Sequence, residues 1–203
     1  MSKNMQEYKK MLDALSATVL RAYLDSVMFV YIIEFANDKR RPNNFLFDYS
    51  YYSIREKAII AAKNLIEPQG NNRLTIEKVI KYLQHNEQHK QYGDEIYLRY
   101  RELFDSEGAK RVKFFRDSLC HNIENEPKIM IYGKDILIII NDVMKILNDI
   151  YLYVFKTKNE NFCKIQNISM LLADDYWGAI CNQADKMPNR SNELMELQKL
   201  FDC

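Results

Sequence analysis

Glycine and proline are scarce in this sequence, with five Gly and four Pro among 203 residues. A β-rich fold needs many turn residues, and a phosphate-binding loop needs several glycines close together. The low content of both residue types therefore argues against these two designs. It leaves room for long helices without internal breaks.

Cysteine and histidine are also few, and neither type is grouped as a metal site requires. The four cysteines form no Cys-x-x-Cys pair, which favours reduced cytosolic thiols over a disulfide framework or a zinc site. His85 and His89 are four residues apart, but no third ligand suggests itself, which favours a solvated helix end. We therefore predict no bound metal.

The sequence has no excess of either charge and no long apolar segment. Its formal net charge is +1, so attraction for a polyanion must come from a local patch. The polar N-terminal residues do not resemble a secretory signal, and the apolar run 136–140 is closed by Asn141 and Asp142. We expect a cytoplasmic protein that does not cross or bind a membrane.

Apolar residues recur at helical spacing along most of the chain, which predicts an all-α protein. No Gly or Pro interrupts residues 5–37, where one long helix or two nearly continuous helices would fit the pattern. The run 136–140 alone is compatible with a buried strand, but the helical period continues beyond strand length. The predicted helices are 5–37, 48–66, 75–85 with Thr75 as its cap, 94–103 with Asp94 as its cap, one through 110–121 that begins after or continues across Ser106, 135–155, 167–181 and 191–201.

The last predicted helix, 191–201, has its apolar residues on one side. It would dock on the helical bundle or on a second subunit. The length of the whole chain is within the range of one domain.

Residues 110–123, KRVKFFRDSLCHNI, are the stretch of the sequence that carries most information about function. They form the end of a predicted amphipathic helix, and Asn125-Glu126-Pro127 predicts a chain reversal after it. Asp117 and His121 are four residues apart and share a helical face. There the carboxylate can orient the imidazole and favour its protonated form.

The helical period places the polar residues of this stretch at different angles. Val112, Phe115 and Leu119 cluster on one side and define the predicted core face. Arg116 lies about 40° from Val112, whereas His121 lies about 180° from it. Arg116 and His121 are therefore about 140° apart on a straight helix. They can meet at one atom only if the helix ends before His121 or if a second copy supplies the missing partner.

Arg116 and His121, with four residues between them, resemble the Arg-x4-6-His motif of the HEPN family. In that family the motif closes one long helix and another long helix follows, as residues 135–155 do here. Residues 52–83, beginning Tyr-Ser-Ile-Arg-Glu-Lys-Ala, also look like the preceding helices of the branch related to abortive-infection protein U. The resemblance covers about residues 10–160.

The resemblance implies a HEPN-like up-and-down helical bundle within a single domain of residues 1–203. Its core would be residues 10–160, and residues 161–203 would be a C-terminal helical extension. It also implies a metal-independent endoribonuclease without a cofactor, which works as a homodimer with two motifs meeting across the interface. Such a protein would act as a toxin or antiphage effector in a prokaryotic cell, in toxin–antitoxin or abortive-infection defence, with an antitoxin or regulatory protein as a possible partner.

The chemistry of RNA cleavage gives the motif residues distinct roles. The RNA 2′-hydroxyl attacks the phosphate, so His121 would serve as general acid or base while Arg116 grips the phosphate. Asp117 would hold the imidazole. Five further side chains would contact RNA by hydrogen bonds or charge: Lys110, Arg111, Lys113, Ser118 and Asn122. Some relatives carry a modifiable tyrosine two residues after the histidine, where this chain has Ile123, so that form of regulation is not expected here.

Two simpler interpretations stand beside the enzyme. Histidine and basic side chains are favourable near the C-terminal end of any helix, because they complement its dipole. The chain would then be a non-catalytic helical module that binds a partner protein or nucleotide.

The fourteen Tyr and ten Phe mostly fall on helical stripes, which favours core packing over base stacking.

Overall fold

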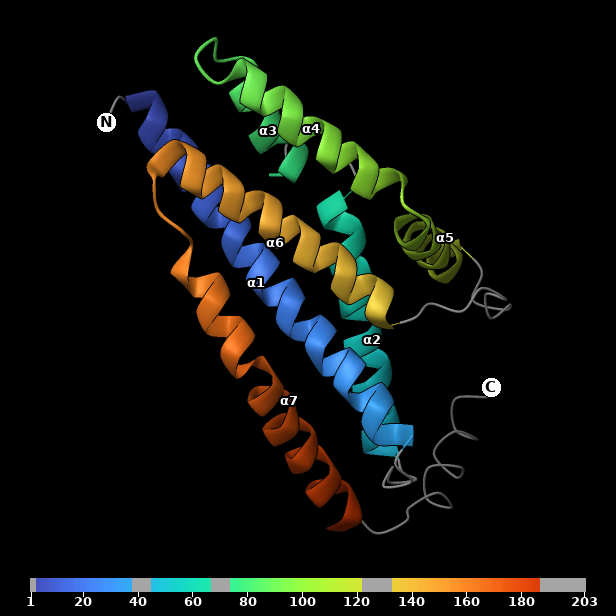
Figure 1. The fold of residues 1–203 in the computed structure, drawn as a ribbon. Coiled ribbons are helices and arrows are strands. Elements are labelled where there is room, and N and C mark those ends of the chain that lie inside the picture. The colour runs from blue at the N-terminus through green and yellow to red at the C-terminus, as the bar shows by residue number, and fades with distance from the viewer. Residues whose placement is uncertain (1–2, 38–44, 67–73, 122–132, 187–203) are drawn as a thin grey trace.

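The computed structural model describes residues 3–37, 45–66, 74–121 and 133–186, and these residues form seven α-helices without a β-strand. This confirms the predicted all-α fold (Figure 1). The predicted helix 191–201 lies outside the described residues. The helices are α1 (Lys3–Asn37), α2 (Phe45–Ile66), α3 (Ile76–Gln84), α4 (Lys90–Asp105), α5 (Glu107–His121), α6 (Gly133–Phe155) and α7 (Glu160–Lys186).

Helix α1 is the central element of the bundle, and α2, α6 and α7 all pack against it (Figure 1). It is one continuous helix, so the first of the two predicted alternatives is correct. Its buried side chains recur at helical spacing and belong to a core that every helix shares. They are Tyr8, Leu12, Leu15, Val19, Ala22, Tyr23, Val27, Phe29 and Ile32.

Part of α1, Asn4–Ile33, is long and apolar enough to cross a membrane by length and composition alone. This helix packs on four other helices, however, and a core helix of this kind has the same composition. The apolar character of α1 is accounted for by its place in the bundle.

Helix α7 belongs to the same core as the helices before it. Trp177 is fully buried, and its indole N–H donates to the carbonyl oxygen of Met28 at 2.9 Å. Phe162 and Ala173 are buried on the same side of α7. The C-terminal part of the chain therefore completes the bundle as far as Lys186. The sequence pattern predicted only its middle, residues 167–181.

Helices α3 and α4 form a closely packed hairpin. Thr75 caps α3 as predicted, because its hydroxyl oxygen accepts the backbone N–H of Lys78 at 3.2 Å. The predicted cap of α4 is wrong: the helix begins at Lys90, and Asp94 lies inside it. The Asp94 carboxylate instead accepts the side-chain amide of Gln84 at 2.8 Å, which joins the two helices.

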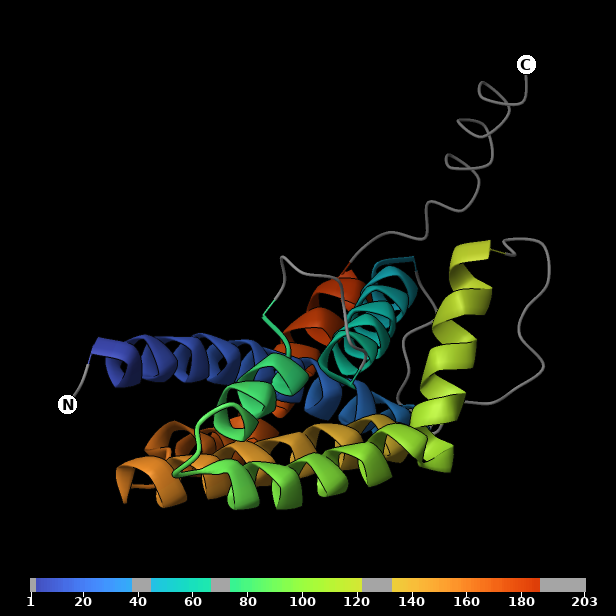
Figure 2. The ribbon, with the colours of Figure 1, turned by 90° about the horizontal axis from the view of Figure 1, so that it is seen from above.

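Ser106 separates α4 from α5, so the predicted alternative of a new helix after this residue is correct. Its hydroxyl oxygen accepts the backbone N–H of Ala109 at 3.2 Å, which satisfies one of the free donors at the start of α5. The chain turns sharply there, and α5 leaves the layer that α4 and α6 form (Figure 2). Helix α6 is helical throughout, including the run 136–140 that alone fitted a strand.

Candidate functional site

Helix α5 carries both residues of the predicted motif on one unbroken helix. It runs through Arg116 and ends at His121, so the helix does not end before the histidine. Val112 is 0% and Phe115 3% exposed, which confirms these two members of the predicted core face. The side chains at positions 118–121 and all of Asn122 lie outside the described structure. The predicted roles of Ser118, His121 and Asn122 therefore stay predictions.

Asp117 binds two cations from two different helices. One of its carboxylate oxygens, Oδ1, accepts from Arg116 Nη1 at 2.9 Å and from Lys63 Nζ at 3.2 Å. Partial burial acts to raise the pKa of Asp117, but the hydrogen bonds from Arg116 and Lys63 outweigh it and lower that pKa. Asp117 is thus held as a carboxylate by its neighbours on α2 and α5. Its predicted contact with His121 stays a prediction, because that side chain lies outside the described structure.

Lys63 is the residue of this cluster that the sequence pattern did not reveal. It lies on α2 and is only 5% exposed, which is unusual for a lysine. Ala58 lies in the middle of the predicted apolar stripe of α2. On a straight helix Lys63 lies about 140° from Ala58 and therefore outside that stripe. Its ammonium group bonds to Asp117 of α5, which packs against α2. A lysine on the polar side of a predicted helix gives no sequence signal of such burial.

Arg111 anchors the first half of α5 to the start of α6. Its guanidinium donates to both carboxylate oxygens of Asp135, at 2.9 and 3.1 Å. Asp135 is only 7% exposed, whereas the Arg111 side chain is 34% exposed, so the carboxylate of this fork-shaped pair is shielded from water and the guanidinium is partly hydrated. The pair joins α5 to the start of α6, and the RNA contact of Arg111 stays a prediction.

The two lysines predicted to contact RNA, Lys110 and Lys113, also have contacts within the chain. Lys113 donates to the carbonyl oxygen of Phe104 at 3.0 Å and lies over the ring of that residue. Lys110 donates to Glu107 at 2.8 Å, and both of these side chains are exposed. An exposed pair of this type is weak and leaves Lys110 able to exchange partners.

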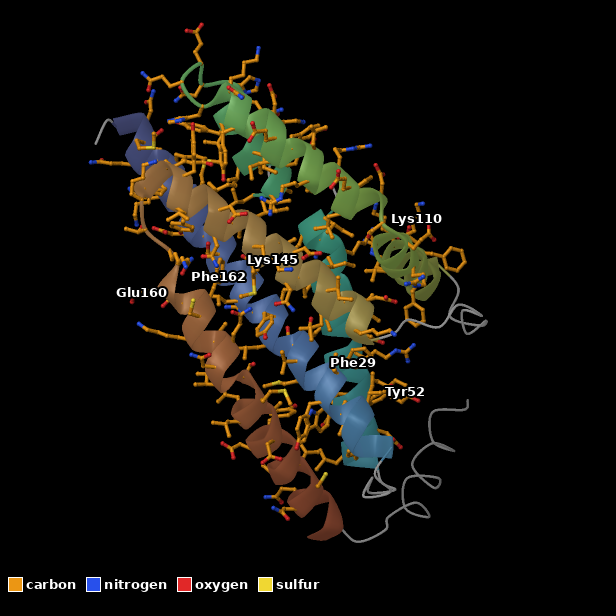
Figure 3. All side chains as sticks on the ribbon, in the orientation of Figure 1. Phe29, Tyr52, Lys110, Lys145, Glu160 and Phe162 are labelled. Carbon is orange, nitrogen blue, oxygen red and sulfur yellow. The ribbon has the colours of Figure 1, made fainter. Side chains whose placement is uncertain are left out.

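The side chain of Arg55, on α2, reaches α5. The guanidinium carbon of Arg55 lies 4.7 Å from the centre of the Phe115 ring and 6.0 Å from that of Tyr52. Tyr52 and Lys110 lie on the same side of the molecule, on α2 and α5 (Figure 3). The α2–α5 junction therefore holds Lys63 and Arg116 at the carboxylate of Asp117, and Arg55 at the ring of Phe115.

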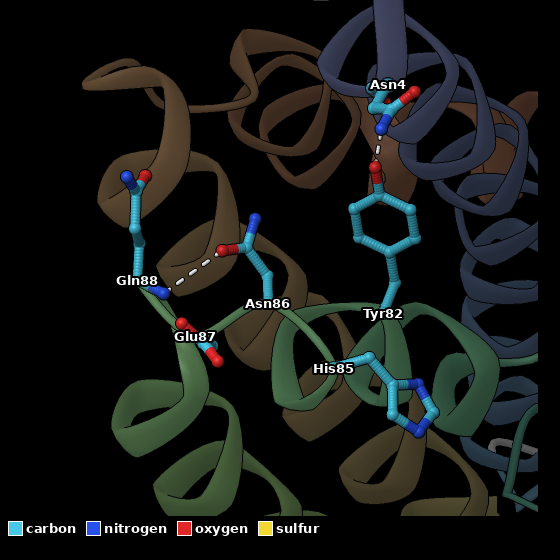
Figure 4. Close-up of a pocket in the computed structure, with 6 residues that line it drawn as sticks. All are labelled: Asn4, Tyr82, His85, Asn86, Glu87 and Gln88. Atoms are coloured by element: carbon cyan, nitrogen blue, oxygen red, sulfur yellow. Dashed lines mark hydrogen bonds between the residues drawn. The ribbon is translucent and has the colours of Figure 1, made fainter.

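The described residues contain no group of three or more His, Cys, Asp or Glu side chains placed to hold a metal ion. His85 lines an open polar pocket at the α3–α4 connection, together with Asn4, Tyr82 and residues 86–88 (Figure 4). The Tyr82 hydroxyl donates to the backbone oxygen of Asn4 at 2.9 Å beside it. His89 packs edge-on against Tyr153, with 5.5 Å between the ring centres. This pocket lies at the other end of α4 from the motif.

No match was found among protein-family models, curated proteins or solved structures. The resemblance to the HEPN family rests on residues of this sequence alone: the spacing of Arg116 and His121, their place at the end of a helix, the long helix after them, and residues 52–83.

Proposed function

We propose that this protein is a metal-independent endoribonuclease of the HEPN type, acting in the cytoplasm as a toxin or antiphage effector. The observation that carries the proposal is the charge distribution at the end of α5. Two cations, Lys63 and Arg116, share one oxygen of a single carboxylate, Asp117, one helical turn before His121. This local excess of positive charge suits a phosphate group, although the net charge of the whole chain is only +1.

In the proposed reaction the RNA cleaves itself with help from the protein. One imidazole takes the proton of the 2′-hydroxyl, whose oxygen attacks the adjacent phosphorus. The bond from phosphorus to the 5′-oxygen breaks, and that oxygen receives a proton from a general acid. The products are a 2′,3′-cyclic phosphate and a 5′-hydroxyl. Arg116 stabilises the extra negative charge on the phosphorane, and Lys63 reinforces it by neutralising Asp117.

The helix geometry supports a site made by two chains. Because α5 is continuous through His121, Arg116 and His121 leave the helix about 140° apart. Two copies of α5 that face each other would bring Arg116 of one copy near His121 of the other. A homodimer therefore forms part of the proposal, and an antitoxin or other regulator would act by covering or separating this surface.

The test is an RNA-cleavage assay in excess chelator with the wild type, Arg116→Ala and His121→Ala. Two matched controls come from the chain itself: Arg101→Ala, which removes an exposed arginine paired with Asp105, and His85→Ala. We expect a loss of at least about 100-fold for the two motif variants, because each removes a group needed only in the transition state. The controls should cleave as the wild type does. Equal cleavage by all five proteins, or none by a wild-type dimer given many RNAs, contradicts the proposal.

A non-catalytic helical module is the second candidate, and one observation favours it. Each cation of α5 among residues 107–117 already has a partner in the same chain: Lys110 with Glu107, Arg111 with Asp135, Lys113 with Phe104 and Arg116 with Asp117. In that case the motif variants would lower thermal stability or partner binding, and no RNA would be cleaved by any of the proteins.

A further inference from the structure

The outer face of α7 carries an unusual concentration of exposed apolar side chains. Ile168, Leu171 and Leu172 are 45%, 67% and 38% exposed. They lie three and four residues apart, so they form one stripe on the helix. The opposite face of α7, with Phe162, Ser169, Ala173 and Trp177, is buried against the bundle. Scattered exposed leucines are common, but a contiguous apolar stripe on one helix marks an interaction surface.

Charged residues flank this stripe in a symmetrical arrangement. Lys164 and Asp175 are both exposed and lie on the same face of α7 as Ile168 and Leu171. The midpoint between Lys164 and Asp175 along the sequence is also the midpoint between Ile168 and Leu171. One midpoint therefore relates Ile168 to Leu171 and Lys164 to Asp175, and the second pair has opposite charges. Leu172 lies at the edge of the stripe, and the position equivalent to it holds Asn167.

From this symmetry we infer that α7 is a self-association surface whose partner is a second copy of the same helix, packed antiparallel about a two-fold axis. With the axis at the shared midpoint, Ile168 of each copy meets Leu171 of the other. The same register places Lys164 of each copy opposite Asp175 of the other. An isologous contact of this kind repeats each favourable pair twice.

The existing contacts of these residues allow the new pairing. Lys164 donates to Glu160 at 3.3 Å, and the two side chains are 70% and 81% exposed. Such an exposed pair holds its partners weakly, so Lys164 can turn to a carboxylate of a second helix. Antiparallel helices 8–10 Å apart, roughly the usual separation, bring facing side chains into contact.

This surface is separate from the site at the end of α5. In Figure 1, α7 lies on the other side of α1 from α5. Pairing through α7 leaves the two α5 helices of that pair apart, so it does not build the composite site of the proposed ribonuclease. The inference therefore stands whether or not the protein cleaves RNA.

The first test measures association of the full chain by sedimentation equilibrium over a wide range of concentrations. Leu171→Gln should raise the dissociation constant of one association step by at least about tenfold, because it places a polar group in the centre of the apolar contact. The matched control is Leu98→Gln on α4, where the leucine is 64% exposed and outside the stripe. Circular dichroism verifies that both variants are folded. A wild type that remains monomeric, or a Leu171→Gln variant that associates as the wild type does, overturns the inference and leaves another protein or another part of the chain to cover the stripe.

Charge reversal tests the register and the identity of the partner. Lys164→Glu and Asp175→Lys each create two like-charge contacts across the axis, so each should weaken association. The double variant restores opposite charges and should recover most of the wild-type association. Failure of the double variant to recover, with both single variants folded and weakened, overturns the antiparallel register.

Discussion

Lys63 and Arg116 reach Asp117 from two different helices, and both contact the same carboxylate oxygen. Lys63 is almost completely buried, and Asp117 is half exposed. The carboxylate thus serves two purposes at once: it compensates a buried ammonium group and it holds the Arg116 guanidinium in place. Separation of α5 from α2 would leave the ammonium group of Lys63 without the Asp117 carboxylate, so this ion pair stabilises the contact between the two helices.

We predict that Asp117→Asn lowers the free energy of unfolding at pH 7 by about 1 kcal/mol, since Lys63 loses a charged partner but the pair is partly screened by water. The pKa of Asp117 is lowered in the folded protein. Its contribution to stability is therefore complete above the ordinary pKa of 3.8 and is lost as the pH falls through the lower, folded value.

Urea unfolding of the wild type and Asp117→Asn at pH 7, and at several points below pH 4, measures this difference. The two proteins should converge in stability as the medium becomes acidic. A difference that stays constant down to the lowest pH would show that Asp117 acts through its shape and not through its charge.

At the scale of elements, the contact between α3 and α4 depends on a glycine. Gly93 of α4 is buried against the end of α3, and a Cβ atom added there would lie 2.8 Å from the backbone nitrogen of Gln84. Backbone atoms cannot move aside as a flexible side chain can. The Asp94 carboxylate bonds to Gln84 at the same place, so the two helices are held closely there.

Gly93→Ala should lower the free energy of unfolding by about 1–2 kcal/mol, because the clash outweighs the better helix propensity of alanine. Gly178 of α7 is the matched control, since an added Cβ there meets no atom within 4 Å. Gly178→Ala should raise the stability by up to about 1 kcal/mol. Denaturation of the two variants beside the wild type gives both values, and equal changes in the two would contradict the close approach at Gly93.

Helical periodicity predicted that every described element is a helix. The sequence also predicted a side-chain contact between residues close along the chain, but it did not predict the contacts between different helices. Thr75 was found because a cap depends on residues close in sequence. Asp94 has the same chemistry as a cap, yet its partner Gln84 comes from another helix, which no local pattern reveals. Lys63 was missed for the same reason: its partner Asp117 belongs to another helix. The ion pair of Arg111 with Asp135 is also long-range, whereas the core positions Val112 and Phe115 follow from the helical period alone.

For the whole molecule, the question is how many copies of the chain the proposed active site needs. Arg116 and His121 belong to one continuous helix and leave it at different angles, so the proposed ribonuclease needs two copies of α5. The stripe on α7 offers a second, independent contact. A protein with both contacts would form assemblies larger than a dimer, in which only the α5 contact is needed for catalysis.

Mixing inactive variants tests the composite site directly. An Arg116→Ala protomer still supplies His121, and a His121→Ala protomer still supplies Arg116, so a mixed dimer keeps one complete site. After unfolding and refolding together in equal amounts, half of the dimers are mixed and each has one of two sites, so about a quarter of the wild-type cleavage should return. Each variant refolded alone should stay inactive.

The double variant Arg116→Ala/His121→Ala mixed with the wild type is the necessary control. Its mixed dimers contain one wild-type arginine and one wild-type histidine on the same chain, and that pair cannot complete a site across the interface. If these mixed dimers cleave RNA and the mixed dimers of the two single variants do not, the arginine and histidine act within one protomer. The site would then have to form at the end of a single α5, against the separation that its helical geometry imposes.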